Sequence, residues 1–129
     1  MAGFLLDTCT FLWIDIDDPS LSARCRSLFQ DPLNEVYLSG ASVWEMVLKY
    51  QLGKLSLPQP PEQFVPAVRG KYRIDFLPID EPSALSILRL PRLHKDPFDR
   101  MIVSQALVHG LTILTPDNDI RRYPVLTDW

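Results

Sequence analysis

The sequence predicts a three-layer α/β/α domain, in which helices cover both faces of a mostly parallel central sheet of four to five short strands. Short apolar runs alternate along the chain with longer segments of helical periodicity. Proline and glycine residues separate these segments, and no repeat or low-complexity tract interrupts them. The chain has 129 residues, 47% of them hydrophobic, which suffices for one sizeable core. We therefore expect a single domain over residues 1–129.

The expected strands are short apolar runs. The run at 4–6 ends in Asp-Thr, which is typical of a buried strand that passes into a turn. The run at 76–79 is either a strand or an extended link. The other expected strands lie at 35–38, 111–114 and 125–126.

The expected helices have apolar residues at helical spacing and recognisable ends. Gly53 stops a helix at 42–52, and Gly110 stops a helix at 97–109 that begins with a proline. The proline-rich segment 57–61 favours a loop inside the domain. Further helices are expected at 21–29, 62–72 and 82–90.

Composition argues against a secreted or membrane protein. The two cysteines, Cys9 and Cys25, form neither a disulfide scaffold nor a paired CxxC metal motif, so reduced packing thiols are expected. The N-terminus lacks the features of a signal peptide, and no apolar stretch approaches the ~20 residues that a membrane span requires. We expect a soluble, cytoplasmic protein.

The charges are unevenly distributed. The formal net charge of −3 argues against binding nucleic acid through bulk charge. A basic run nevertheless stands beside two acids, Asp96 and Asp99. Such a run suits a phosphate polymer held next to a metal ion, although a solvated loop explains it equally well. The run consists of Arg89, Arg92, His94, Lys95 and Arg100.

Acidic residues stand where one expected element passes into the next. Asp7 follows the first strand and Asp117 follows the strand at 111–114. If these strands are parallel, both acids lie at the carboxyl edge of the sheet, where ligands of such folds collect. An Asx-turn is the alternative for either residue considered alone.

Glu45, Asp96 and Asp99 could instead be helix-capping residues. The segment 42–45 fits a capping box, in which Ser42 caps the helix and Glu45 bonds back to the cap amide. Asp96 likewise fits an N-cap before Pro97, with Asp99 in the first helical turn.

Helical geometry favours an inward direction for Asp99. Asp99 heads an apolar stripe, so its carboxylate is expected to point into the domain. Glu45 lies at the margin of another apolar stripe, with Lys49 as an alternative ion-pair partner. The first stripe contains Ile102, Val103 and Ala106, and the second contains Trp44, Val47, Leu48 and Leu52.

A cluster of these acids would require a cation or raised pKa values. Two carboxylates ~4 Å apart repel by about 4 kcal/mol at an effective dielectric of about 20. Hard oxygen ligands favour Mg²⁺ or Mn²⁺ over zinc. His94 and His109 are isolated in the sequence, and surface or helix-end packing is expected for both.

Short motifs along nearly the whole chain resemble one family, the PIN-domain ribonucleases, and most closely the VapC-like toxins of bacterial type II toxin–antitoxin pairs. The segment from His94 to Ala106 is the most specific. Further motifs are Leu5-Leu6-Asp7-Thr8, Ser42-Val43-Trp44-Glu45, Leu52-Gly53-Lys54-Leu55, Leu77-Pro78-Ile79, Gly110-Leu111-Thr112, and Thr115 with Asp117. The resemblance implies a PIN-like fold.

The resemblance also implies a set of site residues. Asp7, Glu45 and Asp99 would be the core metal-binding and catalytic acids, and Asp117 would complete the set. Capping is a sufficient role for Asp96, the remaining metal candidate. One position departs from the family, because Cys9 stands where relatives often have His. Thr8 and Thr115 are expected to support the acids, and Arg100 either orients Asp99 or contacts phosphate.

The function implied by the resemblance is Mg²⁺-dependent hydrolysis of RNA phosphodiester bonds, with Mn²⁺ as a second possible metal. A binding module without activity on the same fold is the alternative. A haloacid-dehalogenase-like phosphatase is disfavoured, because the second aspartate that it needs is replaced by Cys9.

The implied partners are RNA, a small VapB-like antitoxin, and a second copy of the chain or a larger toxin–antitoxin assembly. Large apolar residues are candidate antitoxin contacts, with core packing as the alternative for each. These residues are Trp13, Phe29, Trp44 and Tyr50.

Overall fold

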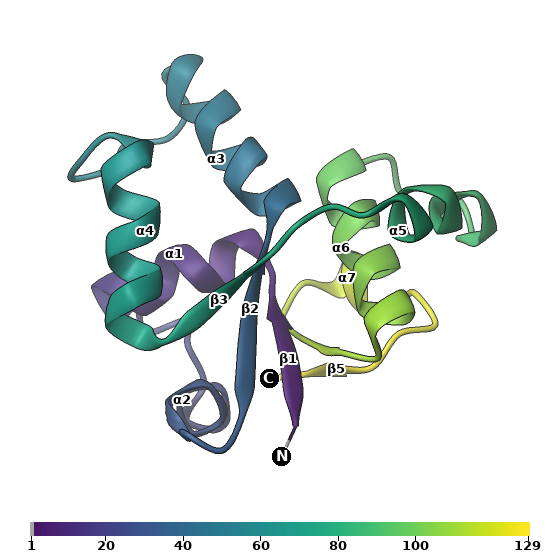
Figure 1. Cartoon of the computed structure of the whole chain (residues 1–129), viewed down its shortest axis with the longest axis horizontal. Helices are drawn as coiled ribbons and strands as arrows, with labels where there is room; N and C mark the ends of the chain where they lie inside the picture. Colours follow the sequence, from purple (N-terminus) through teal and green to yellow (C-terminus); the bar gives the residue numbers. More distant parts are fainter. Residues whose placement is uncertain (1) are drawn as a thin grey trace.

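A computed structural model describes residues 2–129, and its centre is a five-stranded sheet (Figure 1). The strand order is β3-β2-β1-β4-β5, and every neighbouring pair is parallel. The expected fold class, an α/β domain with a mostly parallel sheet, is therefore confirmed. The strands are β1 (Gly3–Leu6), β2 (Glu35–Ser39), β3 (Ile74–Leu77), β4 (Thr112–Leu114) and β5 (Thr127–Asp128).

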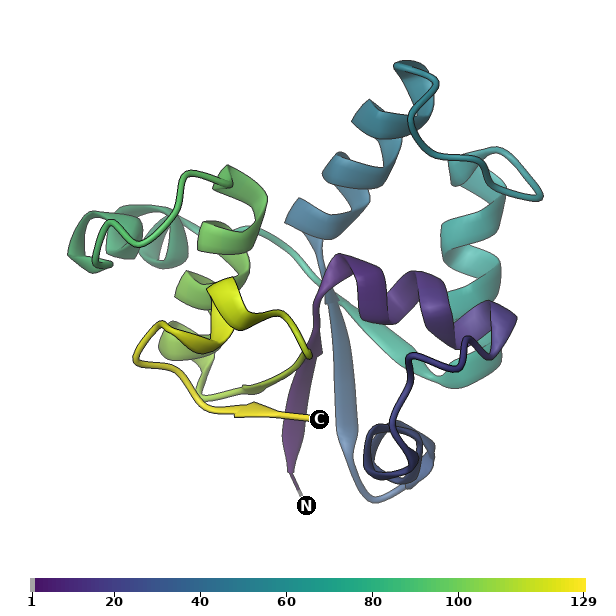
Figure 2. The ribbon, with the colours of Figure 1, turned by 180° about the vertical axis from the view of Figure 1, so that it is seen from behind.

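Helices cover both faces of this sheet, as Figures 1 and 2 show from opposite sides. One face carries α1 (Thr8–Ile16), α2 (Ala23–Gln30) and α4 (Pro61–Tyr72). The other face carries α5 (Glu81–Ser86), the 3₁₀ turn η1 (Ile87–Arg89), α6 (Pro97–His109) and α7 (Asn118–Arg121). Helix α3 (Gly40–Gln51) follows β2 at the carboxyl edge and contributes to both cores.

Strand β1 divides its side chains between the two cores. Phe4 and Leu6 point to the first core, whereas Leu5 points to the second, because successive strand residues face opposite sides of a sheet. Fully burying side chains of this size contributes roughly 1.5–3 kcal/mol each, so both faces of the central strand must be covered. The strand therefore reads as a continuous apolar run rather than an alternating one.

Two helices were not expected from the sequence, α1 and α7. Asp7 and Asp117 accept hydrogen bonds from backbone amides just after them, as an Asx-turn would predict, and the chain then continues as a helix. The first turn of such a helix and an isolated turn share the same local signal. What extends α1 is the burial of Phe11 and Ile14 against the sheet.

Helix ends agree with the sequence where a glycine or proline marks them. Helix α6 spans Pro97–His109 as predicted, and Gly110 ends it in the left-handed conformation at φ 67°. Gly53, at φ 72°, likewise follows α3.

The predicted capping box at α3 is wrong. Ser39 caps this helix instead, since its hydroxyl accepts from the Ala41 amide at 2.9 Å. Helix α3 therefore begins before Ser42, which lies within it and is fully buried.

Several other boundaries differ by a few residues. Strand β3 begins earlier than expected, β4 and β5 begin later, and the expected helix at 82–90 divides into α5 and η1. The three strands are short, and their pairing partners fix their ends. Within residues 2–129, none of the helices has the length and apolar character needed to cross a membrane.

Candidate metal centre

Asp7 lies where β1 passes into α1, at the carboxyl edge of the sheet, and only 4% of the residue is exposed. Its Oδ1 accepts from the Thr10 amide at 2.7 Å, and its Oδ2 accepts from the Thr115 hydroxyl at 2.5 Å. Burial raises the pKa of Asp7, and these hydrogen bonds oppose the shift because they favour the charged form. Asp7 is thus a carboxylate that is costly to ionise in the folded chain.

Thr115 joins two of the predicted site residues. It is fully buried just after β4, and its Oγ1 accepts from the Asp117 amide at 3.0 Å while donating to Asp7. Asp117 in turn caps α7 through the Asp119 amide at 2.8 Å and is exposed. Because β1 and β4 are parallel neighbours, Asp7 and Asp117 share one edge, as predicted.

Glu45 lies on the buried side of α3, with 5% of the residue exposed. Its Oε1 accepts from the Thr8 hydroxyl at 2.6 Å, and its Oε2 pairs with Lys49 Nζ at 2.6 Å. Thr8 Oγ1 also lies 2.9 Å from the hydroxyl of Ser42. Glu45 is therefore directed toward the end of β1, and the Lys49 ion pair considered as an alternative is formed as well.

The apolar stripe predicted around Glu45 faces solvent. Trp44 and Leu52 are each 60% exposed, whereas the buried positions of α3 are Ala41, Ser42, Glu45 and Met46. The side of α3 that faces the domain therefore combines small and polar residues with Met46, which is fully buried in the first core.

Asp96 and Asp99 have different roles at the start of α6. Asp96 Oδ1 caps the helix, accepting from the Phe98 amide at 2.9 Å and the Asp99 amide at 3.1 Å. The side chain of Asp99 is 17% exposed, and its Oδ2 lies 3.3 Å from His94 Nε2. Burial, and then the charge of Asp96, raises the pKa of Asp99 to about 6. The apolar stripe of α6 that begins at Asp99 is buried, as predicted, and contains Ile102, Val103 and Ala106.

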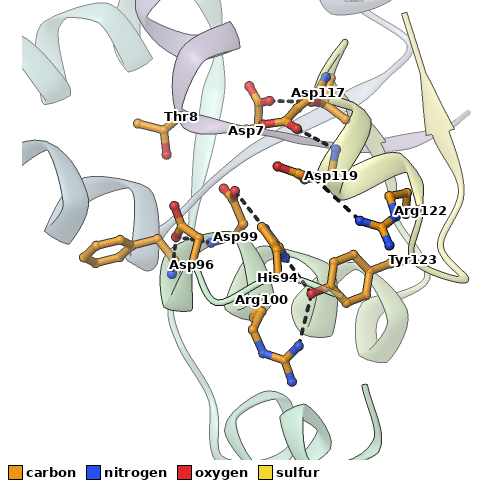
Figure 3. Close-up of polar contacts among 12 residues, drawn as sticks. Asp7, Thr8, His94, Asp96, Asp99, Arg100, Asp117, Asp119, Arg122 and Tyr123 are labelled. Atoms are coloured by element: carbon orange, nitrogen blue, oxygen red, sulfur yellow. Dashed lines mark hydrogen bonds and ion pairs between the residues drawn. The ribbon is translucent and has the colours of Figure 1, made fainter. Parts of the chain in front are cut away.

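The acids face one another across a common space. In Figure 3, Asp7, Asp99 and Asp117 lie around the region between the start of α1, the start of α6 and the turn after β4. The electrostatics agree, because the charge of Asp117 raises the pKa of both Asp7 and Asp99. Glu45 also raises the pKa of Asp99. The structure thus brings together acids that lie far apart in the sequence.

The oxygen atoms of these acids are suitable ligands for a hard divalent cation. Buried carboxylates with raised pKa values are stabilised most in their charged form by a nearby positive charge. Across residues 2–129, however, no three His, Cys, Asp or Glu side chains are already arranged to hold an ion. The oxygens are instead directed to partners within the chain, such as Thr115, Lys49 and His94. Binding an ion would therefore require some of these side chains to rotate.

Arg100 does not contact Asp99 directly. Its Nη1 donates to the Pro91 carbonyl at 2.9 Å and to the Tyr123 hydroxyl at 3.1 Å. Tyr123 in turn contacts His94, which contacts Asp99.

His94 packs against the Tyr123 ring just before α6, as expected, but it also contacts Asp99, which the sequence did not predict. His94 lies five positions before Asp99, in the loop that precedes α6, and a loop residue has no helical or strand periodicity to reveal its direction. The sequence signals were its place in the basic run beside Asp96 and Asp99 and its place within the most specific motif of the resemblance.

The rim of the site carries a basic pocket and a thiol. The pocket has a volume of about 420 Å³ and is lined by Arg92, Leu93, His94, Lys95 and Arg100. Cys9 is exposed beside the acids. Loss of hydration, followed by the charges of Asp7 and Glu45, raises the pKa of the Cys9 thiol to about 11. At neutral pH, a smaller fraction of the Cys9 thiol is therefore ionised than of a free cysteine.

The predicted apolar contact residues divide into two groups. Phe29 is buried in the first core, and Trp13 packs against that core and against Trp129, with 6.0 Å between ring centroids. Trp44 and Tyr50 are exposed on α3. Tyr50 lines an open groove of about 500 Å³ between α3 and α4.

Comparison with known proteins identifies one family. The model of the PIN domain matches residues 4–126. Ribonuclease VapC16 of Mycobacterium tuberculosis (strain ATCC 25618 / H37Rv) is 46% identical over 41 residues, which are 32% of this chain and 29% of that protein. The match to VapC16 thus spans less than a third of the relative's length.

Solved structures share the fold at low sequence identity. VapBC2 from Rickettsia felis, bound to a DNA fragment from its promoter, aligns with a TM-score of 0.74 and 15% identity over 98% of this chain and 97% of that chain. DNA-bound VapBC from Salmonella typhimurium aligns with a TM-score of 0.68 and 23% identity over 99% and 98%. VapBC-1 from nontypeable Haemophilus influenzae aligns with a TM-score of 0.63 and 18% identity over 98% and 96%.

Proposed function

Because the chain belongs to the PIN-domain family, we propose that it is a Mg²⁺-dependent endoribonuclease and the toxin of a type II toxin–antitoxin pair. The observation that supports this proposal most directly is the shared position of the buried acids. Asp7 and Glu45 are nearly inaccessible, and Asp99 has a raised pKa beside them. Carboxylates held together in this way are destabilising unless the site binds a cation.

We assign Asp7, Asp99 and Asp117 as the residues that would hold Mg²⁺ or Mn²⁺, with Glu45 beside them. When bound, such an ion supplies activation of a water molecule and neutralisation of charge on the scissile phosphate. Asp96 serves mainly as the cap that begins α6 and aims Asp99 inward.

Other residues hold the acids and receive the substrate. Thr115 fixes Asp7 in the direction of Asp117, and Thr8 fixes Glu45. The basic pocket next to Asp99 has the charge and the position to bind the RNA backbone, with Arg92 and Lys95 exposed on its rim. Arg100 shapes this pocket while holding the Pro91 carbonyl.

The test is cleavage of RNA by the purified chain with and without Mg²⁺. Asp7→Asn and Asp99→Asn should abolish cleavage while leaving the circular dichroism spectrum unchanged. Asp75→Asn is the matched control, because Asp75 is an exposed acid on the edge strand β3. Full activity in either site variant would overturn the assignment.

A second candidate function is a binding module on the same fold without catalytic activity. The observation that favours it is that the acids already have partners within the chain, including Lys49 on Glu45 and His94 on Asp99. In that case, calorimetric titration with Mg²⁺ or Mn²⁺ would show no binding, and no RNA would be cleaved. Saturable metal binding with metal-dependent cleavage excludes it.

The proposed protein partner is a small VapB-like antitoxin that covers the groove between α3 and α4. This groove is open and largely apolar, and it extends from Tyr50 on α3 to Val65 on α4. We further propose a homodimer or larger toxin–antitoxin assembly, a cytoplasmic location, and a single domain over residues 1–129. A single sheet that carries both hydrophobic cores supports the last of these proposals.

A further inference from the structure

A buried tyrosine hydroxyl links Arg100 to Asp99. Tyr123 is 3% exposed, and its hydroxyl oxygen lies 3.1 Å from Arg100 Nη1 and 2.7 Å from His94 Nδ1. The other ring nitrogen of His94, Nε2, lies 3.3 Å from Asp99 Oδ2. Four side chains from three segments therefore form one row of contacts, which Figure 3 shows.

The chemistry of the groups fixes the first hydrogen-bond direction in this row and favours one direction for each of the others. The Arg100 guanidinium has only donors, so the Tyr123 oxygen must accept from it. The single hydroxyl proton of Tyr123 is then available to His94 Nδ1, which accepts it. A neutral imidazole that accepts at Nδ1 carries its own proton on Nε2. That proton is the one that His94 donates to the Asp99 carboxylate.

A different proton arrangement would leave a buried group unpaired. If His94 carried a proton on Nδ1, the Tyr123 oxygen would receive two donors, and its own proton would have no acceptor among the contacts of the row. An unpaired buried hydroxyl costs about 1–3 kcal/mol, so the first arrangement is favoured.

We propose that His94 is a positioning residue for Asp99, held as the Nε2–H tautomer by Tyr123 and Arg100. The proposal rests on the assignment of Asp99 as a catalytic acid. His94 binds Oδ2 of Asp99, while no hydrogen bond from residues 2–129 reaches Oδ1. The carboxylate is thereby oriented with one oxygen held and the other available to the acidic site.

The same row also connects three segments around the site. Arg100 belongs to α6 and holds the Pro91 carbonyl of the preceding loop, and Tyr123 follows α7. The His94 and Tyr123 rings pack with 5.4 Å between centroids. Asp99 is therefore positioned both by its own helix, α6, and by the segment after α7 that contains Tyr123.

The tautomer can be observed directly, because the chain has only two histidines. In ¹⁵N-labelled protein without added metal, above neutral pH, His94 should show a protonated Nε2, an unprotonated Nδ1, and an Nε2 proton protected from exchange with water. His109→Gln assigns the two sets of signals, since the His109 contact with Asp80 lies on the surface. Tyr123→Phe should reduce the protection of the His94 proton.

Two outcomes of this measurement overturn the inference. The first is a protonated Nδ1 on His94 in the wild type. The second is an Nε2 proton that exchanges as fast as that of His109, or that is unaffected by Tyr123→Phe. Both are independent of activity, so they distinguish failure of this inference from failure of the proposed ribonuclease function.

Kinetics then test the consequence for Asp99. Outer hydrogen-bond partners of metal-binding residues are typically worth about 10–100-fold in activity, so His94→Ala should lower kcat by that factor. His94→Gln should recover most of the loss, because a glutamine amide can donate from a position close to that of Nε2, whereas His94→Asn should not. Arg92→Ala serves as the comparison, since it removes a charge from the same pocket outside the row and should mainly raise KM. Equal activity in His94→Ala and wild type would contradict the positioning role.

Discussion

Asp7, Asp96 and Asp117 each use a carboxylate oxygen to cap a helix. A carboxylate has two oxygens and about four lone-pair sites, so capping leaves capacity for a second role. At Asp7 the second oxygen is bound by Thr115. Capping and site formation are therefore compatible, and at these positions the cap fixes the direction of the side chain.

Asp99 should destabilise the folded chain when it is charged. Its pKa is raised from 3.8 to about 6, so the folded protein binds this proton more tightly than the unfolded protein does. The corresponding stabilisation is present below the unfolded-state pKa and is lost as the pH rises through about 6. Replacing Asp99 by a neutral residue should remove this loss of folding stability at high pH.

We therefore expect Asp99→Asn to be more stable than wild type by roughly 1–2 kcal/mol at about pH 8 without metal, since one pKa unit corresponds to about 1.4 kcal/mol and partial exposure screens the effect. Thermal unfolding in the presence of a chelator measures this difference. The gain should disappear near pH 4 and should be absent in Asp75→Asn. A gain of the same size at both pH values would contradict the charge explanation.

Thr115→Val should weaken metal binding at Asp7. Valine keeps the shape of the buried side chain but removes a hydrogen bond that favours the charged form of Asp7. The pKa of Asp7 should rise further, and a metal must then displace a more tightly held proton. The Mg²⁺ concentration for half-maximal cleavage should rise about tenfold.

Thr112→Val is the matched control for this measurement, because Thr112 lies at the opposite end of the same strand, β4. If the Thr115→Val protein kept the Mg²⁺ dependence of the wild type, Thr115 would have no role in metal binding.

Helix α3 owes its position to polar contacts at its first turn. Ser39 caps the helix and donates its hydroxyl to Gln105 of α6, which is fully buried. Gln105 also donates to the Pro78 carbonyl at 3.0 Å. These bonds join α3, α6 and the link after β3, so the elements that deliver Glu45 and Asp99 are held to each other directly.

The glycines of two helices should respond to alanine in opposite directions. Gly110 ends α6 at φ 67°, and an added Cβ would meet no atom there within 4 Å, so Gly110→Ala should cost about 1–2 kcal/mol through backbone strain alone. Gly70 lies in α4 with equally open space and without a positive φ, so Gly70→Ala should add about 0.5–1 kcal/mol.

Urea unfolding of the two alanine variants measures both changes against wild type. Because an added Cβ meets no atom at either site, a loss of stability in both variants would contradict the explanation by backbone conformation.

Across the whole molecule, the exposed apolar side of α3 faces away from both cores. Trp44 contacts Phe98 of α6, with 5.1 Å between ring centroids, yet remains 60% exposed. Tyr50 borders the groove toward α4. This side of the molecule, beside the acidic site, therefore offers a covering partner several exposed apolar side chains, namely Trp44, Leu48, Tyr50 and Leu52.

Tyr50→Glu should weaken binding of the proposed antitoxin by at least about tenfold, because a charge in an apolar groove must be desolvated on binding. The measurement is co-purification and titration with the protein encoded next to the gene for this chain. Leu88→Glu is the control, since Leu88 is exposed on η1 outside the groove. Equal binding by both variants would place the antitoxin elsewhere.

Much of the fold could be predicted from local signals. Periodicity and terminal proline or glycine residues located α6 to the residue, because caps and breakers act within a few positions of the backbone. The same signals failed for α1, α7 and the start of α3, where an Asp or Ser side chain serves a turn and a helix equally well. Packing against the sheet decided between them.

The sequence by itself determined the parallel α/β architecture and the presence of acids at element ends, since both follow from periodicity and from where strands stop. Only the tertiary structure decided how those acids meet. Thr115 reaches Asp7 across 108 positions of sequence, Thr8 reaches Glu45 across 37, and Tyr123 reaches His94 across 29. Such contacts depend on strand order and helix docking, which bring together residues that no local pattern connects.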